Sequence, residues 1–159
     1  MKTNLEKKQN GLILTKEGLE NLKSELKELT EVKRPQNIKT IKEAREMGDI
    51  SENSMYDAAR EEQSFIEGRI AELEEIIRSA KITECISNGT INVGSKVTVH
   101  IDGSEEVFYI VGAPEADPIN KKISHESPLG TALLGKKPGD KIEVEAPMGK
   151  LIYTVLKID

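Results

Sequence analysis

A long repeat of apolar residues between residues 56 and 80 is the feature of this sequence that most constrains its fold. The repeat alternates spacings of three and four residues, which is typical of a helix that packs along its whole length against a partner helix. Its members are Tyr56, Ala59, Gln63, Ile66, Ile70, Leu73, Ile77 and Ala80, with Gln63 as the one polar interruption. The pattern predicts a long helix with one narrow apolar seam.

A second amphipathic segment precedes this helix. Thr15 is placed to cap its start, although Gly18 stands where a capping box would have Glu. Pro35 interrupts the segment because it lacks a backbone donor, and apolar residues resume at Ile38 and Ile41, whereas an unbroken heptad predicts positions 36 and 40. We therefore expect a kink or a local rewinding near Pro35. Four leucines with spacings of three, four and three come before it: Leu19, Leu22, Leu26 and Leu29.

Gly48 marks the expected end of this first helical segment, because glycine readily takes the left-handed conformation that follows many helices. So few residues separate it from the second helix that the two helices must run antiparallel as a hairpin. Helices of some 30 residues make an arm about 45 Å long. The tip of this arm is residues 48–53, with the sequence GDISEN.

In the second half of the chain the apolar period changes to two, which is typical of strands. Strands are predicted on both sides of an Asp102-Gly103 turn, and a similar pair lies near the end of the chain. Between the pairs, Ser127 as N-cap and Pro128 as first helical residue predict one short helix. The sequence thus predicts an α+β protein with a coiled-coil hairpin in residues 1–84 and a compact antiparallel sheet with a short helix in residues 89–159.

Charge balance and cysteine content limit what the chain can bind. The formal net charge is -5, from 23 basic and 28 acidic residues, which argues against a protein that coats nucleic acid with a uniformly basic surface. Cys85 is the only cysteine, so no intramolecular disulfide can form, and two histidines with one cysteine cannot build a usual structural zinc site. Because we find no apolar leader and no apolar run long enough to span a membrane, we expect a cytoplasmic protein.

Two acidic residues at the tip, Asp49 and Glu52, allow two interpretations. In the first, they cap the second helix as a capping-box-like pair and stabilise it by about 1 kcal/mol without any chemistry. In the second, the two carboxylates bind Mg²⁺, which commonly takes one or two protein carboxylates and fills its other positions with water and phosphate oxygens. Such a half-site is weak alone and would be completed inside the active site of another enzyme. Spacing alone favours the capping interpretation.

The basic residues near the tip also have two interpretations. Between residues 31 and 47, five basic residues outnumber three acidic ones, which reverses the sign of the whole chain. Charge alone favours a solvated helix face, whereas Arg60, within three turns of the tip, is placed to meet a phosphate backbone. Tyr56 opens the apolar seam and is more typical of a packing residue than of a base-stacking platform.

The segment GDISENSMYDAAREEQ, followed by FIEGRIAELEEIIRSAKI, closely resembles the signature of the GreA/GreB family of bacterial transcript cleavage factors, which are transcription elongation factors. Further similarity lies in LTKEGLENLKSEL, RPQNIKTIKEAREMGD, IVGAPEADP and ISHESPLGTALLGKKPGD, so the resemblance extends over roughly residues 12–158. It implies an N-terminal antiparallel coiled coil and a C-terminal FKBP-like domain.

The resemblance also implies a function. RNA polymerase is the expected partner: the globular domain docks at the rim of its secondary channel and the coiled coil reaches the catalytic centre. Asp49 and Glu52 match the family's two catalytic acids, which hold an Mg²⁺ ion shared with the polymerase and orient water for attack near the 3′ end of backtracked nascent RNA. Arg45, Tyr56 and Arg60 are the expected contacts with RNA or polymerase. We expect a monomer that retains no ion when free, and an accessory factor rather than an enzyme.

Where the family usually reads SENAEYDAAREEQ, this chain has Ser54 and Met55, so an apolar side chain replaces a glutamate beside the tip. The alternative is therefore a paralogue that occupies the channel and inhibits or modulates the polymerase without stimulating cleavage. Two further hypotheses are a passive coiled-coil adaptor and a prolyl isomerase in the C-terminal half. That half has few aromatic residues to line a proline pocket, namely Phe108, Tyr109 and Tyr153.

Overall fold

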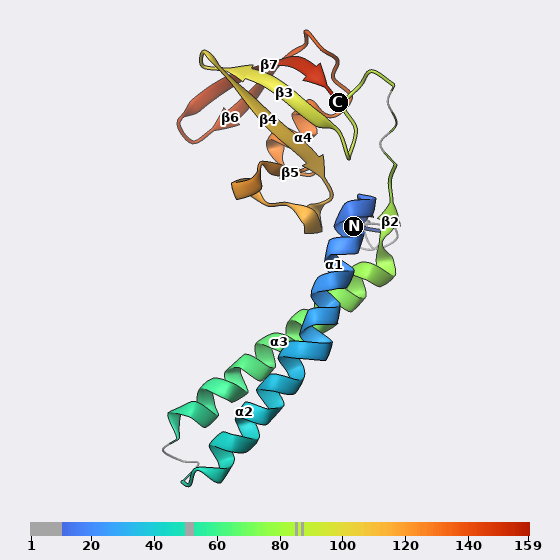
Figure 1. The fold of residues 1–159 in the computed structure, drawn as a ribbon. Coiled ribbons are helices and arrows are strands. Elements are labelled where there is room, and N and C mark those ends of the chain that lie inside the picture. The colour runs from blue at the N-terminus through green and yellow to red at the C-terminus, as the bar shows by residue number, and fades with distance from the viewer. Residues whose placement is uncertain (1–10, 50–52, 85, 87) are drawn as a thin grey trace, which may run out of the picture. The chain divides into compact units, whose positions relative to one another are not determined.

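The computed structural model describes residues 11–49, 53–84, 86 and 88–159. These residues form two compact units (Figure 1). The helical unit is Glu20–Ser79, and the globular unit joins the residues up to Leu19 with Ala80–Asp159. Within the described ranges, no helix is long and apolar enough to cross a membrane.

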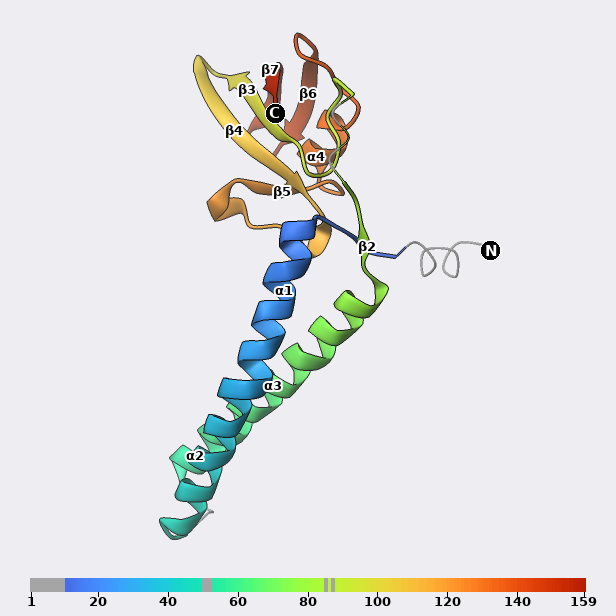
Figure 2. The ribbon, with the colours of Figure 1, turned by 45° about the vertical axis from the view of Figure 1, so that its right-hand side comes forward.

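The helical unit is an antiparallel hairpin. Helix α1 (Lys16–Glu28) continues through a π-helix, η2 (Leu29–Lys33), into α2 (Arg34–Glu46), and α3 (Ser54–Ser79) returns beside them (Figures 1 and 2). The long helix predicted from the apolar repeat is confirmed, because its buried residues are members of that repeat: Ala59, Ile66, Ile70 and Leu73.

The local rewinding expected near Pro35 is the π-helix η2. A π turn holds one residue more than an α turn, so it shifts the heptad pattern by one position. The seam of α2 accordingly lies at Asn37, Ile41 and Ala44, one residue later than an unbroken heptad places it. The prediction for Ile41 is confirmed. The prediction for Ile38 was wrong, because its side chain is 53% exposed and Asn37 takes the seam position.

The globular unit contains a five-stranded sheet in the order β5-β4-β3-β7-β6 (Figures 1 and 2). The strands are β3 (Lys96–Ile101), β4 (Ser104–Val111), β5 (Lys122–Ser124), β6 (Lys141–Ala146) and β7 (Gly149–Ile158). The predicted α+β class is confirmed. The short edge strand β5 was not predicted; it pairs parallel with β4, so the sheet is mixed, while its other neighbouring strands pair antiparallel.

Helix α4 (Pro128–Leu133) completes the hydrophobic core of this unit. Its predicted cap is confirmed, since the Ser127 hydroxyl accepts a hydrogen bond from Gly130 N at 3.0 Å and Pro128 is the first helical residue. Leu133 of α4 packs with side chains from the strands and from the segment before them: Ile91, Val97, Val99, Ile110, Ile142, Tyr153 and Val155.

The start of α1 is fixed within the globular unit. Thr15 caps it as predicted, because its hydroxyl oxygen accepts a hydrogen bond from Gly18 N at 3.0 Å. Glu115, in the short 3₁₀ helix η4 (Ala113–Glu115), accepts hydrogen bonds from Thr15 N at 2.8 Å, from the Thr15 hydroxyl and from Gly112 N at 3.1 Å. A carboxylate from 100 residues away therefore takes the place of the local Glu in a capping box.

Two short strands of the globular unit lie next to the hairpin in sequence. Strand β1 (Ile13–Leu14) precedes α1 and pairs parallel with β2 (Lys81–Ile82), which follows α3. A second 3₁₀ helix, η5 (Pro118–Asn120), lies between β4 and β5. Residues 13–14 and 81–82, which come before and after the hairpin in sequence, therefore pair within the globular unit.

Candidate functional site

Asn53 closes the hairpin at its tip. Its Oδ1 accepts hydrogen bonds from Met55 N at 3.1 Å and Tyr56 N at 3.2 Å, which are donors of the first turn of α3. Its Nδ2 donates to Ala44 O, near the end of α2, at 2.5 Å. One amide therefore satisfies groups on both helices. An ionised carboxylate could not do this, because it has no hydrogen to donate.

Asp49 is exposed at the same tip, shortly after α2 ends. The residue that caps the described start of α3 is Asn53, which the capping interpretation did not name. Gly48, directly before it, has a φ of +126°, so the prediction of a residue with positive φ after the helix is confirmed. Glu52, the second predicted acid, lies outside the described residues.

The donor chemistry of the tip fits part of a magnesium site. Asp49 is an exposed residue, and its carboxylate is the type of protein ligand that Mg²⁺ prefers. In the part of the chain that the structure describes, no three His, Cys, Asp or Glu side chains gather in a group that could hold a metal ion. The Asp49 carboxylate fits as one ligand of such an ion.

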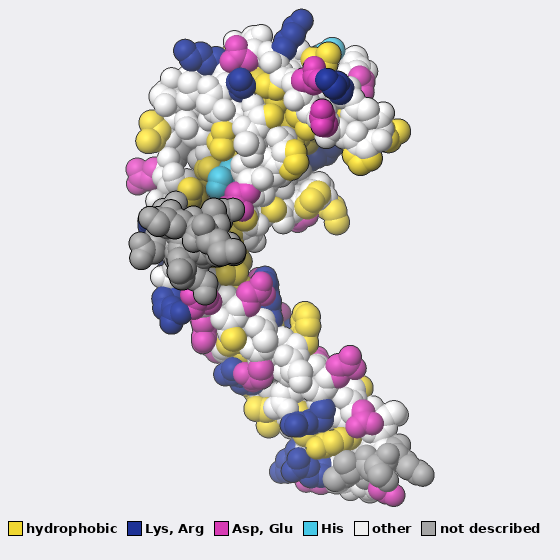
Figure 3. Space-filling view, turned by 180° about the vertical axis from the view of Figure 1, so that it is seen from behind, with side chains coloured by type: hydrophobic (Ala, Val, Ile, Leu, Met, Phe, Trp, Pro, Cys, Tyr) yellow, Lys and Arg dark blue, Asp and Glu magenta, His cyan; other side chains and the backbone are white. Residues whose placement is uncertain are grey.

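A groove of about 260 Å³ lies between α2 and α3 near the tip, and we call it the tip groove. Figure 3 shows Lys and Arg side chains next to hydrophobic ones at this end of the hairpin. Such a groove suits a ligand with negative charge and some apolar surface, such as a nucleotide chain. The residues that line it are Ile38, Ile41, Lys42, Arg45, Arg60 and Gln63.

The structure brings the predicted contact residues Arg45, Tyr56 and Arg60 to this end of the hairpin. The Arg45 guanidinium lies over the Tyr56 ring, with Cζ 6.0 Å from the ring centroid, which is a cation–π geometry. Arg60 is exposed, and its Nη1 donates to Gln63 Oε1 at 2.8 Å. The partly buried Tyr56 ring thus supports one arginine of the tip groove, while Gln63 orients the other.

Other basic residues of the same stretch are held by carboxylates. Arg34 donates to both carboxylate oxygens of Glu67, at 2.7 and 2.6 Å, and this hydrogen bonding raises the pKa of Arg34. Lys39 lies 3.6 Å from a Glu43 oxygen, one helical turn away. Some of the basic residues counted in the sequence therefore form ion pairs with carboxylates. The cations that line the tip groove are Lys42, Arg45 and Arg60.

Sequence reasoning missed two residues of this region. Asn53 was not predicted as the cap of α3, although Asn is among the best N-cap residues and directly precedes Ser54. Lys42 was counted only in a charge balance, because its place in the tip groove depends on the one-residue shift caused by η2. A local sequence pattern indicated Asn53, whereas no local pattern indicated Lys42.

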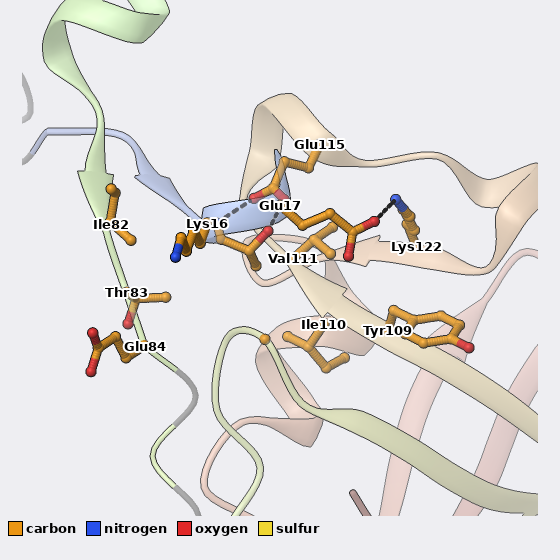
Figure 4. Close-up of a pocket in the computed structure, with 12 residues that line it drawn as sticks. Lys16, Glu17, Ile82, Thr83, Glu84, Tyr109, Ile110, Val111, Glu115 and Lys122 are labelled. Carbon is orange, nitrogen blue, oxygen red and sulfur yellow. Dashed lines mark hydrogen bonds and ion pairs between the residues drawn. The ribbon is translucent and has the colours of Figure 1, made fainter. Parts of the chain in front are cut away.

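The globular unit holds a larger cavity, of about 360 Å³ (Figure 4). Its walls come from the start of α1, from residues 82–84 and from β4, and Lys122 faces Glu17 across it at 3.9 Å. Tyr109 is the one aromatic residue among the described residues that line it. Phe108 and Tyr153 instead pack edge to face, with ring centroids 6.5 Å apart. This arrangement argues against the prolyl isomerase hypothesis, which needs an aromatic-lined pocket.

Comparison with known proteins assigns both halves of the chain to one family. Residues 12–82 match the family model "Transcription elongation factor, N-terminal", and residues 86–159 match "Transcription elongation factor, GreA/GreB, C-term". The transcription elongation factor GreA of Thermoanaerobacter pseudethanolicus is 51% identical over 92% of this chain and 96% of its own length. The GreA of Lactococcus lactis subsp. cremoris is 48% identical, with the same coverage of 92% and 96%.

Among solved structures, the GreA factor homolog 1 (Gfh1) protein of Thermus thermophilus is 34% identical and covers 94% of this chain and 99% of its own, with a TM-score of 0.45. The two family models together extend over nearly all of the described residues, and the relatives match over nearly their full length. The chain belongs to the GreA/GreB family of transcription elongation factors.

Proposed function

We propose that this transcription elongation factor stimulates RNA polymerase to cleave backtracked nascent RNA near its 3′ end, which releases arrested complexes. One observation carries the proposal: an exposed acid, Asp49, lies at the tip of a two-helix arm, where the Asn53 amide bonds to both helices. The 26 residues of α3 alone give the arm a reach of about 39 Å. The arm is thus built to carry a carboxylate into a site that lies inside a partner.

Asp49 and Glu52 would hold an Mg²⁺ ion that RNA polymerase shares. When bound, this ion supplies positive charge that eases ionisation of a water molecule and neutralises charge on a phosphate. The role of the two carboxylates is to position that charge and to accept a hydrogen bond from the attacking water. The protein therefore completes an active site that the polymerase mostly provides, and it acts as an accessory factor in the cytoplasm rather than as a complete enzyme.

The tip groove would hold the displaced RNA end. Lys42, Arg45 and Arg60 provide positive charge beside the acidic tip, whereas the chain as a whole carries a net charge of -5. This protein therefore contacts only a short stretch of RNA at the tip groove, and it does so while bound to the polymerase. RNA binding weakens as the salt concentration rises, and the slope of this dependence reflects the number of phosphate contacts. Neutralising one of these cations should reduce that slope by the share of about one contact.

The test uses stalled elongation complexes that carry 3′-labelled RNA. The variant Asp49→Asn/Glu52→Gln should abolish the release of short labelled fragments while its circular dichroism and its binding to polymerase stay unchanged. Asp57→Asn is the matched control, since Asp57 lies in the first turn of α3 and should not be needed for cleavage. Cleavage by the double variant at the wild-type rate would overturn the metal-holding role. A wild-type protein that binds and slows the polymerase without fragment release would support the inhibitor alternative.

A further inference from the structure

An asparagine fills the seam position of α2 that its apolar neighbour was predicted to take. Asn37 is 3% exposed, whereas Ile38 is 53% exposed. Burial alone favours the opposite arrangement, because apolar surface gains from leaving water and an amide loses its hydration. The cost is increased by Oδ1 of Asn37, which is buried and has no hydrogen-bond partner among the described residues. Burial of Ile41 and Ala44 favours the observed orientation of α2, but at residue 37 a further interaction must offset the cost of burying an amide beside an exposed Ile38.

The Asn37 amide bonds to α3. Its Nδ2 donates to Ala59 O at 2.9 Å and to Glu62 Oε2 at 3.3 Å. These hydrogen bonds require residue 37 to face α3. A single buried polar residue in a helix–helix seam can fix the alignment of two helices at a cost in stability. Asn37 has the burial and the partners that this role needs.

The orientation of α2 decides which side chains line the tip groove. Successive residues of a helix point about 100° apart, so seating residue 37 in the seam turns Ile38 outward. Ile38 and Arg45 are seven residues apart and therefore share a face. Both line the tip groove, together with Lys42 from the same helix and Arg60 from α3. Turning α2 by half a residue step, about 50°, would bury Ile38 against α3 and move Arg45 with it.

We propose that Asn37 is a positioning residue: through its bond to Ala59 O, its amide sets the rotation of α2 and keeps Ile38, Lys42 and Arg45 in the tip groove. The effect on transcript cleavage rests on the proposed function. The rotation itself is a property of the free hairpin and is tested without polymerase.

The rotation is measured as a distance between two spin labels in the full chain. Lys39→Cys on α2 and Ser64→Cys on α3 provide exposed labelling sites in a Cys85→Ser background. A side chain about 5 Å from the helix axis moves about 4 Å when the helix turns by 50°. In this background Asn37→Ala should therefore shift the mean distance by about 4 Å or add a second population. Asn37→Ala with an unchanged distance distribution would overturn the proposal.

Two further variants separate positioning from general stability. Asn37→Ala/Ile38→Ser should restore the wild-type distance, because serine gives α2 no apolar surface to bury by turning. A purely stabilising role predicts the reverse, with the double variant at least as perturbed as the single one. Thr40→Ala is the matched control on α2. The Thr40 hydroxyl donates within its own helix, to Gln36 O at 3.1 Å, so the distance should stay unchanged.

Cleavage by stalled complexes gives the second readout. At saturating protein, Asn37→Ala should slow fragment release roughly tenfold, because small displacements of positioned groups strongly reduce rates. A shifted distance with an unchanged cleavage rate would overturn the positioning role. If the wild-type protein releases no fragments, the proposed function fails, while the label distances still decide whether Asn37 sets the rotation.

Discussion

The same substitution, glycine to alanine, should have opposite effects at two helical positions of this protein. In α3, a Cβ on Gly68 would meet no heavy atom within 4 Å. Gly68→Ala should therefore stabilise the protein by about 0.5–1 kcal/mol, because alanine loses less backbone entropy than glycine when a helix forms. In α1, a Cβ on Gly18 would lie 1.8 Å from Oε1 and 2.0 Å from Cδ of Glu115, so the carboxylate must leave its place.

The cost of Gly18→Ala follows from what Glu115 gives up. Its carboxylate accepts hydrogen bonds from Thr15 N, the Thr15 hydroxyl and Gly112 N. Hydrogen bonds to a charged group contribute about 1.5–3 kcal/mol each, and the lower end suits this part-buried site, which gives about 4.5 kcal/mol for three. Alanine returns at most about 1 kcal/mol of helix propensity, and hydration of the displaced carboxylate returns some more. The net destabilisation should be about 2 kcal/mol.

Urea unfolding followed by far-ultraviolet circular dichroism measures these changes in the free energy of unfolding. The double-mutant cycle with Glu115→Ala provides the decisive comparison, because removing the carboxylate removes the clash. In that background Gly18→Ala should become stabilising, like Gly68→Ala. Stabilisation of the otherwise wild-type protein by Gly18→Ala, or an equal cost of this substitution with and without Glu115, would contradict the predicted clash.

Two other perturbations test the tip and the core. Asn53→Ala should destabilise the protein by about 1 kcal/mol, because it removes the N-cap of α3 and the bond to Ala44 O. Urea unfolding measures this change, with Ser64→Ala, an exposed substitution within α3, as the control. Equal stability of the two variants would contradict the capping role. Burial, with smaller contributions from the charges of Asp102 and Glu106, raises the pKa of Tyr153 above its ordinary value. Because the folded state disfavours the ionised phenol, the contribution of Tyr153 to the free energy of unfolding is fully present below pH about 10, where the unfolded phenol begins to ionise. This contribution is lost as the pH rises toward the higher folded-state pKa. Tyr153→Phe should remove this part of the alkaline decline, and identical stability curves of both proteins between pH 8 and 11 would show that Tyr153 does not contribute to it.

Much of the fold was predictable because its determinants are local. The apolar repeat of α3, the cap of α1 at Thr15 and the cap of α4 at Ser127 each depend on residues within a few positions of one another. The turn between β3 and β4 is equally local, with φ of +48° at Asp102 and +83° at Gly103, as the Asp-Gly pair predicts. These features follow from periodicity and backbone preference alone.

The remaining features depend on contacts that no local pattern contains. Glu115 caps α1 from 100 residues away, and Gly18 gives no indication of that partner in the sequence. The π turn before Pro35 was expected only as an unspecified rewinding, so the choice between Asn37 and Ile38 for the seam was not predicted. That choice fixes the composition of the tip groove. The groove was therefore the part of the candidate site that sequence reasoning described least well.

The tip shows why one acid there is open to a functional role. Closing a helical hairpin requires acceptors for the first N–H groups of the second helix and, at this tip, a donor for the Ala44 carbonyl of the first helix. The Asn53 amide supplies both, at 3.1 and 3.2 Å for the N–H groups and 2.5 Å for the carbonyl, whereas an aspartate in that place could supply only the first. Asn53 therefore caps α3, and Asp49 is an exposed residue four positions before it. Replacing Asp49 keeps the Asn53 amide in place, so an Asp49 variant that unfolds in urea like the wild type and yet loses cleavage would report on chemistry rather than on folding.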